Sequence, residues 1–308
     1  MSIETKKKIL AFVVCTEPGQ LEFKAMLLIK SIRHFGGRLR NAPIYSFQPR
    51  GGGALTAATL GAFSRFGVTH NTDALNTAFP EYPFANKIAA AAYAEQHVET
   101  RFLAFVDSDK VFFKEPAALI LPEGFSAGVR PVHTKNIGTD GRNDSNRFYW
   151  EKLYNELDCS PRHHVQATVT EETILPYWNA GLITVRRRAG IFSVWEKNFQ
   201  RIMRLGLQPQ SGSFFVEQSV LSATICALGV HPLTLPSSYN YPFSLHNHMP
   251  PSKRIGSLEN VVSVHYHDMF DMQRSAHPLE RLREIDLKTE KALWFRNQLR
   301  ACRVYFGS

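Results

Sequence analysis

The sequence predicts an α/β protein in which helices flank a mainly parallel central sheet. Three observations support this fold class. Short apolar runs are typical of buried strands, helical patterns lie between them, and the two alternate as far as Asp109. The 308 residues, 44% of them hydrophobic, suffice for a substantial core. We therefore expect one domain over residues 1–308, divided into 1–115, 116–270 and a C-terminal helical extension over 271–308.

The first half of the chain has the more regular pattern. Its opening apolar run, Ile9–Cys15, predicts a core strand, and apolar residues at helical spacing follow from Leu21 to Phe35. Glycines at positions 36 and 37 end that helix. The next predicted elements are a strand over Asn41–Phe47, a helix over Leu55–Phe66, a short strand over Gly67–His70 and a helix over Pro83–His97. An apolar strand then begins at Phe102 and has Asp107 and Asp109 at its C-terminal end, after which apolar sequence resumes as far as Phe113.

The second half is less periodic, so we expect an irregular region there. Ser160–Thr173 has few apolar residues, and long loops of this kind are often lids. The predicted elements are a strand over Phe125–Val132, a polar loop over His133–Asn146, helices over Tyr149–Leu157, Ala189–Leu205 and Ser213–Leu228, strands over Tyr177–Val185 and Asn260–His267, and a charged helical segment over Leu279–Cys302.

The net charge of +9 favours an anionic partner. Nucleic acid, an acidic membrane surface and a phosphorylated small molecule all fit that charge. The basic N-terminus and Arg186–Arg188 could contact such a partner, although clusters of this kind are more often solvated surface. No basic motif interleaved with aromatic residues is present, so nucleic acid is not expected.

Cysteine usage and hydropathy indicate where the protein resides. The four cysteines show no C-x-x-C spacing, which fits a reducing cytoplasm. The apolar run after Lys6–Lys8 is short and lacks a small-residue cleavage site, so it predicts a core strand rather than a signal peptide. No stretch approaches the roughly 18 apolar residues of a membrane span. We expect a cytoplasmic protein, with peripheral contact at the inner membrane face left open.

The strongest candidate for chemistry is Asp107-Ser108-Asp109, which follows the apolar residues of the strand that begins at Phe102. Open α/β sheets bind ligands at the carboxyl ends of their strands. Two carboxylates flanking one serine can share a hard cation, which commonly bridges to phosphate oxygens. The same three residues also favour a plain turn without any metal.

Two further polar clusters accompany predicted strands. Asn179-Ala180-Gly181 belongs to one of them, and His265, His267 and Asp268 follow another. Imidazole nitrogen together with carboxylate oxygen suits Mn²⁺ better than Mg²⁺, because imidazole is the softer ligand. A single histidine at a strand end is more often structural. Beside the two aspartates, His265 is the better third ligand, with His267 as the alternative.

The order and spacing of six motifs carry a family resemblance. The motifs are Phe12–Thr16, Asn86 and Lys87, Phe105–Asp109, Trp178–Ile183, Phe215–Ser219 and Val262–Tyr266. In this order they resemble the metal-dependent nucleotide-sugar glycosyltransferases of the GT-A fold, most nearly the glycogenin-like and lipopolysaccharide galactosyltransferase-like branch. The resemblance extends from about Ile9 to Phe270. It implies a nucleotide-binding half over 1–115 and a sugar and acceptor half over 116–270.

The resemblance implies a donor and metal site. Asp107 would face both ribose and metal, Asp109 would be the stronger metal ligand, and His265 would complete the site for Mn²⁺ or Mg²⁺. Thr16 would hold the nucleoside, and Lys87 would lie near the donor unless it is simply a solvated helix residue.

The motif downstream of His265 departs from the glycogenin-like pattern. That group has a glycine and then a lysine-proline pair that contacts phosphate, whereas this chain has His267-Asp-Met-Phe-Asp-Met-Gln-Arg274. Arg274 is the candidate replacement for the missing cation, with Lys253-Arg254 as the alternative.

The resemblance also implies a sugar site. Asn179 and Gly181 would approach the transferred sugar and its acceptor, since glycine permits close backbone approach. Glu217 and Gln218 match an acidic residue and glutamine at the start of the sugar-binding helix. The carboxylate could bind sugar hydroxyls, act as a base or stabilise an oxocarbenium-like centre. The alternative for Glu217 is a helix N-terminal residue favoured by the macrodipole.

The predicted function is therefore a metal-dependent, hexosyltransferase-like glycosyltransferase. It would move a sugar from a nucleoside-diphosphate sugar, UDP-sugar favoured, to a hydroxyl of a glycan, a lipid or another molecule. A basic glycan- or nucleic-acid-binding protein on a degenerate transferase scaffold is one alternative. A sugar nucleotidyltransferase is another, although the segment after the first strand, Thr16–Gln20, lacks the glycine- and arginine-rich phosphate loop expected of it.

Overall fold

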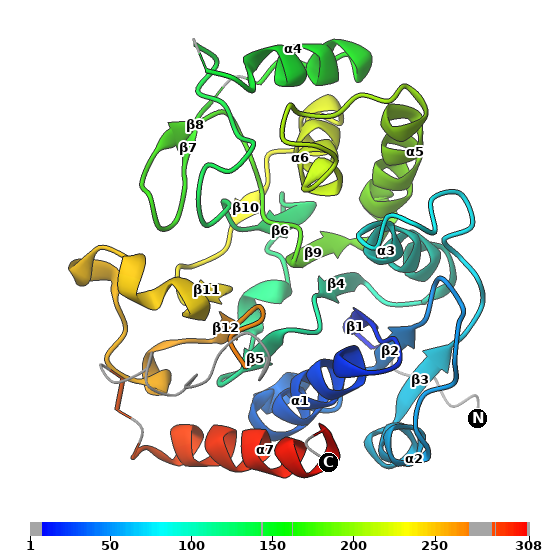
Figure 1. Ribbon diagram of the computed structural model, residues 1–308, viewed down its shortest axis with the longest axis vertical. Helices are drawn as coiled ribbons and strands as arrows, with labels where there is room; N and C mark the ends of the chain where they lie inside the picture. Colours follow the sequence, from blue (N-terminus) through cyan, green and yellow to red (C-terminus); the bar gives the residue numbers. More distant parts are fainter. Residues whose placement is uncertain (1–7, 143, 162, 271–284, 287, 307–308) are drawn as a thin grey trace.

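The computed structural model describes residues 8–142, 144–161, 163–270, 285–286 and 288–306. A seven-stranded sheet lies at its centre (Figure 1). In spatial order its strands are β10 (Leu233–Thr234), β6 (Ala127–Val129), β9 (Leu182–Arg186), β4 (Phe102–Val106), β1 (Leu10–Cys15), β2 (Ile44–Phe47) and β3 (Val68–Asn71). The helices are α1 (Gln20–Phe35), α2 (Ala57–Phe66), α3 (Ala85–His97), α4 (Arg147–Glu156), α5 (Ile191–Arg204), α6 (Val216–Ala227) and α7 (Glu290–Phe306).

Strand direction in the sheet is parallel with one exception. Strands β4, β1, β2 and β3 pair in parallel, and β10 pairs in parallel with β6. Only β9 among these seven runs antiparallel to both of its neighbours, β4 and β6. The predicted α/β class with a mainly parallel central sheet flanked by helices is confirmed.

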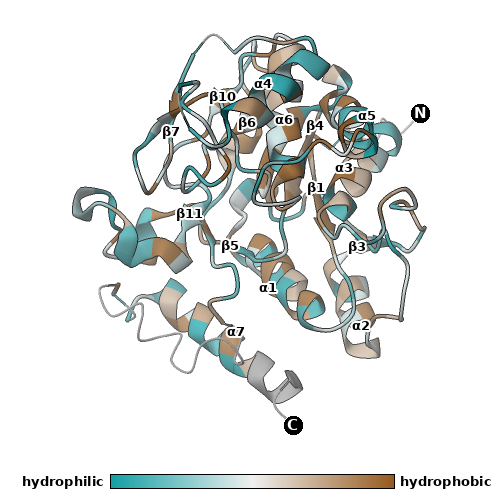
Figure 2. Ribbon diagram, turned by 45° about the horizontal axis from the view of Figure 1, so that its top comes forward, coloured by the Kyte–Doolittle hydropathy of each residue, from teal (hydrophilic) through white to brown (hydrophobic). Residues whose placement is uncertain are grey.

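Both faces of the sheet are buried, because successive strand residues point to opposite sides. In β1, Leu10, Phe12 and Val14 belong to the core beneath α1 and α2, whereas Ala11 and Val13 belong to the core shared with α3, α5 and α6. Figure 2 shows hydrophobic residues gathered around β1, β4 and α3. This two-sided burial explains why the strands read as continuous apolar runs rather than as alternating patterns.

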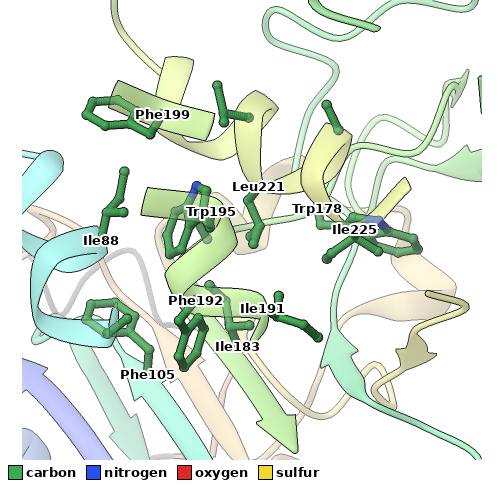
Figure 3. Close-up of a cluster of buried hydrophobic side chains, with 14 of the residues drawn as sticks. Ile88, Phe105, Trp178, Ile183, Ile191, Phe192, Trp195, Phe199, Leu221 and Ile225 are labelled. Atoms are coloured by element: carbon green, nitrogen blue, oxygen red, sulfur yellow. The ribbon is translucent and has the colours of Figure 1, made fainter. Parts of the chain in front are cut away.

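The larger core lies between the sheet and α3, α5 and α6. Ile88 of α3, Phe192 and Trp195 of α5 and Leu221 of α6 gather over Phe105 of β4 (Figure 3). Burying each such side chain contributes about 1.5–3 kcal/mol relative to leaving it exposed. This packing fixes α6 against the sheet, which determines where Glu217 in its first turn lies.

The strand predicted to begin at Phe102 ends just before Asp107, as expected, and the segment Phe102–Phe113 is divided between two sheets. Strand β4 ends at Val106, a turn follows, and β5 (Lys110–Phe112) joins a separate sheet with β11 (Tyr241–Pro242) and β12 (Ser263–His265). In this sheet β5 pairs antiparallel with β12, so that His265 lies opposite Lys110. Apolar periodicity continues across the turn because β4 and β5 are both fully buried.

Two other predicted strands are shorter than expected. The strand predicted over Tyr177–Val185 begins only at Leu182 and ends at Arg186, and the one predicted over Phe125–Val132 is reduced to β6. Within the segment predicted as irregular, β7 (Val165–Gln166) and β8 (Thr173–Ile174) pair as a small antiparallel ladder.

The C-terminal helix α7 begins later than predicted. The predicted helical segment starts at Leu279, but residues 279–284 and 287 lie outside the described chain, and α7 runs from Glu290. Trp294 stacks on His34 of α1 with ring centroids 5.4 Å apart, and Phe295 meets Phe113 edge-on at 5.6 Å. Helix α7 therefore packs against α1 and against the residue that follows β5. No helix within the described ranges combines the length and apolar character needed to cross a membrane.

The arginine cluster after β9 is partly structural. Arg186 donates to the carbonyl oxygens of Pro122 and Phe125, and Arg187 donates to those of Thr100 and Glu95. Arg188 is exposed. Because two of the three guanidinium groups bind backbone carbonyls, the cluster offers less free positive charge than its sequence indicates.

Candidate active site

The antiparallel direction of β9 places its first residues beside the last residues of β4. The Asp107 backbone N–H donates to the Gly181 carbonyl oxygen at 2.8 Å. A Cβ atom at Gly181 would lie 2.6 Å from Asp107 Oδ2 and 3.0 Å from Lys110 Nζ. Only glycine fits at this position without moving its neighbours. The Asn179–Gly181 segment therefore reaches the aspartates because it precedes a reversed strand.

Lys87, on the first turn of α3, forms an ion pair with Asp107. Its Nζ lies 2.9 Å from Oδ1 and 3.0 Å from Oδ2 of that carboxylate. Burial opposes the charged amine, but the carboxylates of Asp107 and Glu217 outweigh burial and raise the pKa of Lys87. Lys87 is therefore a buried cation at the carboxyl end of β4 and not a solvated helix residue.

Asp109 and His265 face each other across the turn. His265 Nε2 lies 3.2 Å from Asp109 Oδ1. Yet this oxygen is buried and has no hydrogen-bond partner of suitable geometry among the described residues. One ligand atom from each of Asp107, Asp109 and His265 lies within 4.8 Å of the others. The structure thus brings together the three residues predicted to bind metal.

These three residues fit a divalent metal ion. A buried carboxylate oxygen without a partner loses its hydration and regains little, so it is costly unless a ligand or ion binds it. Burial lowers the pKa of His265 well below its usual range, despite the nearby Asp109, which leaves a neutral imidazole able to bind metal. Two carboxylates and one imidazole form a mixed oxygen and nitrogen set that suits Mn²⁺.

Lys110 is a site residue that sequence reasoning missed. Its side chain is fully buried, burial lowers its pKa to about 8, and its ammonium donates to Asn240 Oδ1. Asn240 Nδ2 in turn donates to Asn179 Oδ1 at 3.0 Å. The available signal was a single lysine directly before the apolar residues Val111–Phe113, since lysine is rarely fully buried unless paired.

Two more histidines lie beside His265. One ligand atom from each of His133, His265 and His267 lies within 4.8 Å of the others. The rings of His265 and His267 stack with centroids 3.7 Å apart, and His267 shares a 2.6 Å hydrogen bond with Ser244 Oγ. His267 was the predicted alternative ligand. His133 had no signal in the sequence, because it opens a polar loop far along the chain from the other two.

Glu217 lies in the first turn of α6 with its side chain buried. Tyr82 donates to Glu217 Oε2 at 2.6 Å. Burial raises the pKa of Glu217, although the Lys87 ammonium partly offsets it. Lys87 and Glu217 each shift the pKa of the other, so Glu217 lies on the side of the site that Lys87 occupies.

Gln218 supports the turn that precedes β9. Its Oε1 accepts from the Ala180 N–H at 3.0 Å, and its Nε2 donates to the Tyr177 hydroxyl at 2.9 Å. Both ends of its amide are therefore engaged by the protein. The contacts give Gln218 a role in fixing the position of Asn179–Gly181.

The residues around the end of β1 form a continuous polar network. Thr16 is buried, and its hydroxyl accepts from Ser46 Oγ at 2.8 Å. The next residue, Glu17, receives two hydrogen bonds from the Arg50 guanidinium, at 2.6 and 2.8 Å, and one from Asn86 Nδ2 at 2.8 Å. Arg50 and Asn86 therefore both serve to hold Glu17 at the end of the first strand.

The structure describes some of the cations predicted to replace the lysine-proline pair, but not all of them. Arg274 lies outside the described residues. Of the alternatives, Lys253 forms an ion pair with Glu171, and Arg254 donates to the carbonyl oxygens of Met249 and Asn247.

The protein family and the solved structure that are similar to this chain are both described as glycosyltransferases. Residues 12–229 match the model of the Rhodobacterales glycosyltransferase domain. The apo structure of WbbM, a bifunctional glycosyltransferase, is similar with a TM-score of 0.54 over 97% of this chain, at 12% identity. At that identity the likeness concerns the fold, and this chain spans 53% of WbbM.

No curated protein sequence matches the chain. The family match covers most of the chain and includes the Asp107-Ser108-Asp109 turn, the Asn179–Gly181 turn and the start of α6. The glycogenin-like branch stays a prediction. The fold, the match and the order of the motifs lead to one conclusion: the chain belongs to the Rhodobacterales glycosyltransferase domain family and has a fold of GT-A-like type.

Proposed function

We propose that the protein is a metal-dependent glycosyltransferase that uses a nucleoside-diphosphate sugar, with a UDP-sugar as the favoured donor. The acceptor is a hydroxyl group of a glycan, a lipid or another molecule. In the reaction, the acceptor oxygen forms a bond to the anomeric carbon and the bond from that carbon to the diphosphate oxygen breaks. The acceptor proton is released, and the nucleoside diphosphate leaves.

One observation carries the proposal: ligand atoms of Asp107, Asp109 and His265 converge within 4.8 Å at the carboxyl end of a central strand. The two aspartates lie on the turn between β4 and β5, whereas His265 ends β12 far along the chain, so local sequence does not bring the histidine to them. The unpartnered Asp109 oxygen supports a bound cation there. Bound Mn²⁺ or Mg²⁺ would act as a Lewis acid toward the charge that develops on the departing diphosphate.

The surrounding residues have distinct tasks under this proposal. Lys87 supplies a second positive charge for the diphosphate, and Thr16 and its neighbours hold the nucleoside. Glu217 accepts hydrogen bonds from hydroxyl groups of the transferred sugar. Asn179 donates to them through Nδ2, because its Oδ1 already accepts from Asn240 Nδ2 and the Gly181 N–H. Gly181 leaves room for the sugar beside Asp107, because a side chain there would collide with the carboxylate.

A donor panel tests the proposal. Purified protein is incubated with UDP-, GDP- and other nucleotide-sugars, with Mn²⁺, Mg²⁺ or EDTA, and release of nucleoside diphosphate is measured. Wild type should hydrolyse or transfer at least one donor in a metal-dependent manner. Asp109→Asn should lose this activity by about 1,000-fold, because it removes a charged ligand from a preorganised electrostatic site, while circular dichroism shows an unchanged fold.

Three results would contradict the proposal. Absence of metal-dependent turnover with every donor would reject a nucleotide-sugar transferase. Salt-sensitive glycan or nucleic-acid binding that survives Asp109→Asn would favour the binding-protein alternative. Release of pyrophosphate from a nucleoside triphosphate and a sugar phosphate would favour a nucleotidyltransferase.

A further inference from the structure

His265 uses both nitrogens of its ring, and each faces a different residue. Nε2 points to the metal site, 3.2 Å from Asp109 Oδ1. Nδ1 lies 3.3 Å from Nε2 of His133, whose side chain is buried. The two imidazoles are therefore connected nitrogen to nitrogen, on the side of His265 that faces away from the carboxylate.

We propose that His133 is a positioning residue for the metal ligand His265. It accepts a hydrogen bond from His265 Nδ1–H and so keeps the Nε2 lone pair directed at the cation beside Asp109. The inference rests on the metal site of the proposed function and assigns a task to a residue outside the ligand set.

Histidine chemistry requires such a partner. A neutral imidazole carries one N–H and one lone pair, so a ring that binds metal through Nε2 must carry its proton on Nδ1. Metal-ligating histidines almost always donate that second N–H to an acceptor. Among the described residues, His133 is the hydrogen-bond partner of His265 Nδ1. Without it, this N–H would be buried and unpaired.

His133 is suited to the task because its side chain is buried beside His265 and its backbone is fixed. Its backbone carbonyl accepts from the Val169 N–H at 2.7 Å, which anchors it to the segment after β7.

The other nitrogen of the His133 ring shows that the arrangement costs free energy. His133 Nδ1 is buried and has no hydrogen-bond partner within the described part of the chain. An unsatisfied buried polar group costs about 1–3 kcal/mol. An apolar side chain would fill the same space without that cost, so stability alone gives no reason for a histidine here.

Three variants test the inference through Mn²⁺ binding alone, measured by titration calorimetry without donor. His133→Gln carries an acceptor at about the reach of Nε2. His133→Asn carries the same amide one methylene shorter, and His133→Leu has no acceptor. We expect Gln to bind Mn²⁺ close to wild type, and Asn and Leu to bind it 10- to 100-fold more weakly. The exposed His97, changed to Leu, is the control and should bind as wild type.

The outcomes separate this inference from the proposed function. Failure of wild-type protein to bind Mn²⁺ would reject the metal site itself. Wild-type affinity in a folded Asn or Leu variant would overturn the positioning role, and so would equal losses in Gln and Asn. The comparison of Gln with Asn keeps the test valid if the Leu variant does not fold.

Discussion

Two polar regions at the same edge of the sheet differ in how completely their groups are paired. Around the end of β1, Arg50 and Asn86 both donate hydrogen bonds to Glu17, and Ser46 donates one to Thr16. Around the end of β4, by contrast, buried nitrogen and oxygen atoms of His133 and Asp109 have no partner within the described ranges.

The difference indicates which groups maintain the fold and which await a ligand. Paired buried groups stabilise a unique structure, whereas unpaired ones cost free energy unless something binds them. Substitutions in the paired network should therefore reduce stability and spare metal binding. Substitutions at the unpaired edge should weaken metal binding and leave stability unchanged. The Asp109→Asn and His133 variants above test the second half of this contrast, and three further changes extend it.

The largest of these effects is expected for Gly181→Ala, at the unpaired edge. The new methyl group would lie 2.6 Å from Asp107 Oδ2, so the carboxylate must move away from the donor. Misplacement of about 1 Å can cost roughly 100-fold in rate. We expect a loss of that size in turnover, measured at saturating donor, with the fold preserved by circular dichroism.

Gly256→Ala is the matched control for Gly181, because a Cβ atom there meets nothing within 4 Å. It should retain wild-type turnover. Equal activity of Gly181→Ala and wild type would show that the close approach of Gly181 to Asp107 has no catalytic importance.

An intermediate effect is expected for Glu17→Gln, in the paired network. The change removes the charge that holds Arg50 and leaves the guanidinium with a weaker partner. We expect a loss of about 0.5–1.5 kcal/mol in the free energy of unfolding, measured by urea denaturation, because the partly exposed Arg50 guanidinium and Asn86 keep only a neutral acceptor in place of a carboxylate. Mn²⁺ affinity measured without donor should stay at the wild-type value.

Glu151→Gln provides the control for this ion pair. Glu151 pairs with Arg147 on the surface of α4, where both side chains are more than 40% exposed. Exposed pairs of this kind are worth about 0–1 kcal/mol. Equal stability losses in the two variants, or a loss of Mn²⁺ binding in Glu17→Gln, would remove the distinction between the two regions.

The smallest effect concerns Glu22, a second fully paired carboxylate. Burial opposes its ionisation, but hydrogen bonds from the Thr59 and Thr56 side chains and the Thr56 N–H outweigh burial and lower the pKa of Glu22 below 4.5. Because the pKa of Glu22 is lower in the folded than in the unfolded protein, its ionisation stabilises the fold at pH values above the pKa of the unfolded state. This contribution is lost as the pH falls through the pKa of the folded state.

Glu22→Gln should therefore reduce stability most near pH 7, by about 1 kcal/mol. The difference from wild type should shrink as the pH falls below 4.5. Urea denaturation of both proteins at several pH values measures it. A difference that grows on acidification would contradict the stabilising role of the ionised carboxylate.

The sequence predicted the sheet well because two-sided burial leaves a local signal. Strands β1 and β4 read as apolar runs, and each connecting helix has its own periodicity. The end of β4 at the two aspartates could be predicted this way, but the entry of β5 into a second sheet could not. A change of sheet alters the partners of a strand without altering its burial, and hydropathy records only burial.

The site was predictable where its residues adjoin a strand and hidden where they come from loops. Asp107, Asp109 and His265 each follow or end an apolar run. His133 lies in a polar segment, and only its distance to His265 in the folded chain identifies it. Lys110 had only a weak signal, because a lysine directly after Asp109 resembles an ordinary turn residue.

The reversed direction of β9 has a consequence for how the protein folds. The parallel strands β1–β4 come from the first third of the chain, but β9 and β12 must return from much later segments to complete the edge. The contact between His133 and His265 closes a loop of 132 residues. Long-range closure is slow because chain entropy is lost before the contact forms. During refolding, secondary structure should therefore appear before Mn²⁺-binding competence, which makes the metal a reporter of the last step.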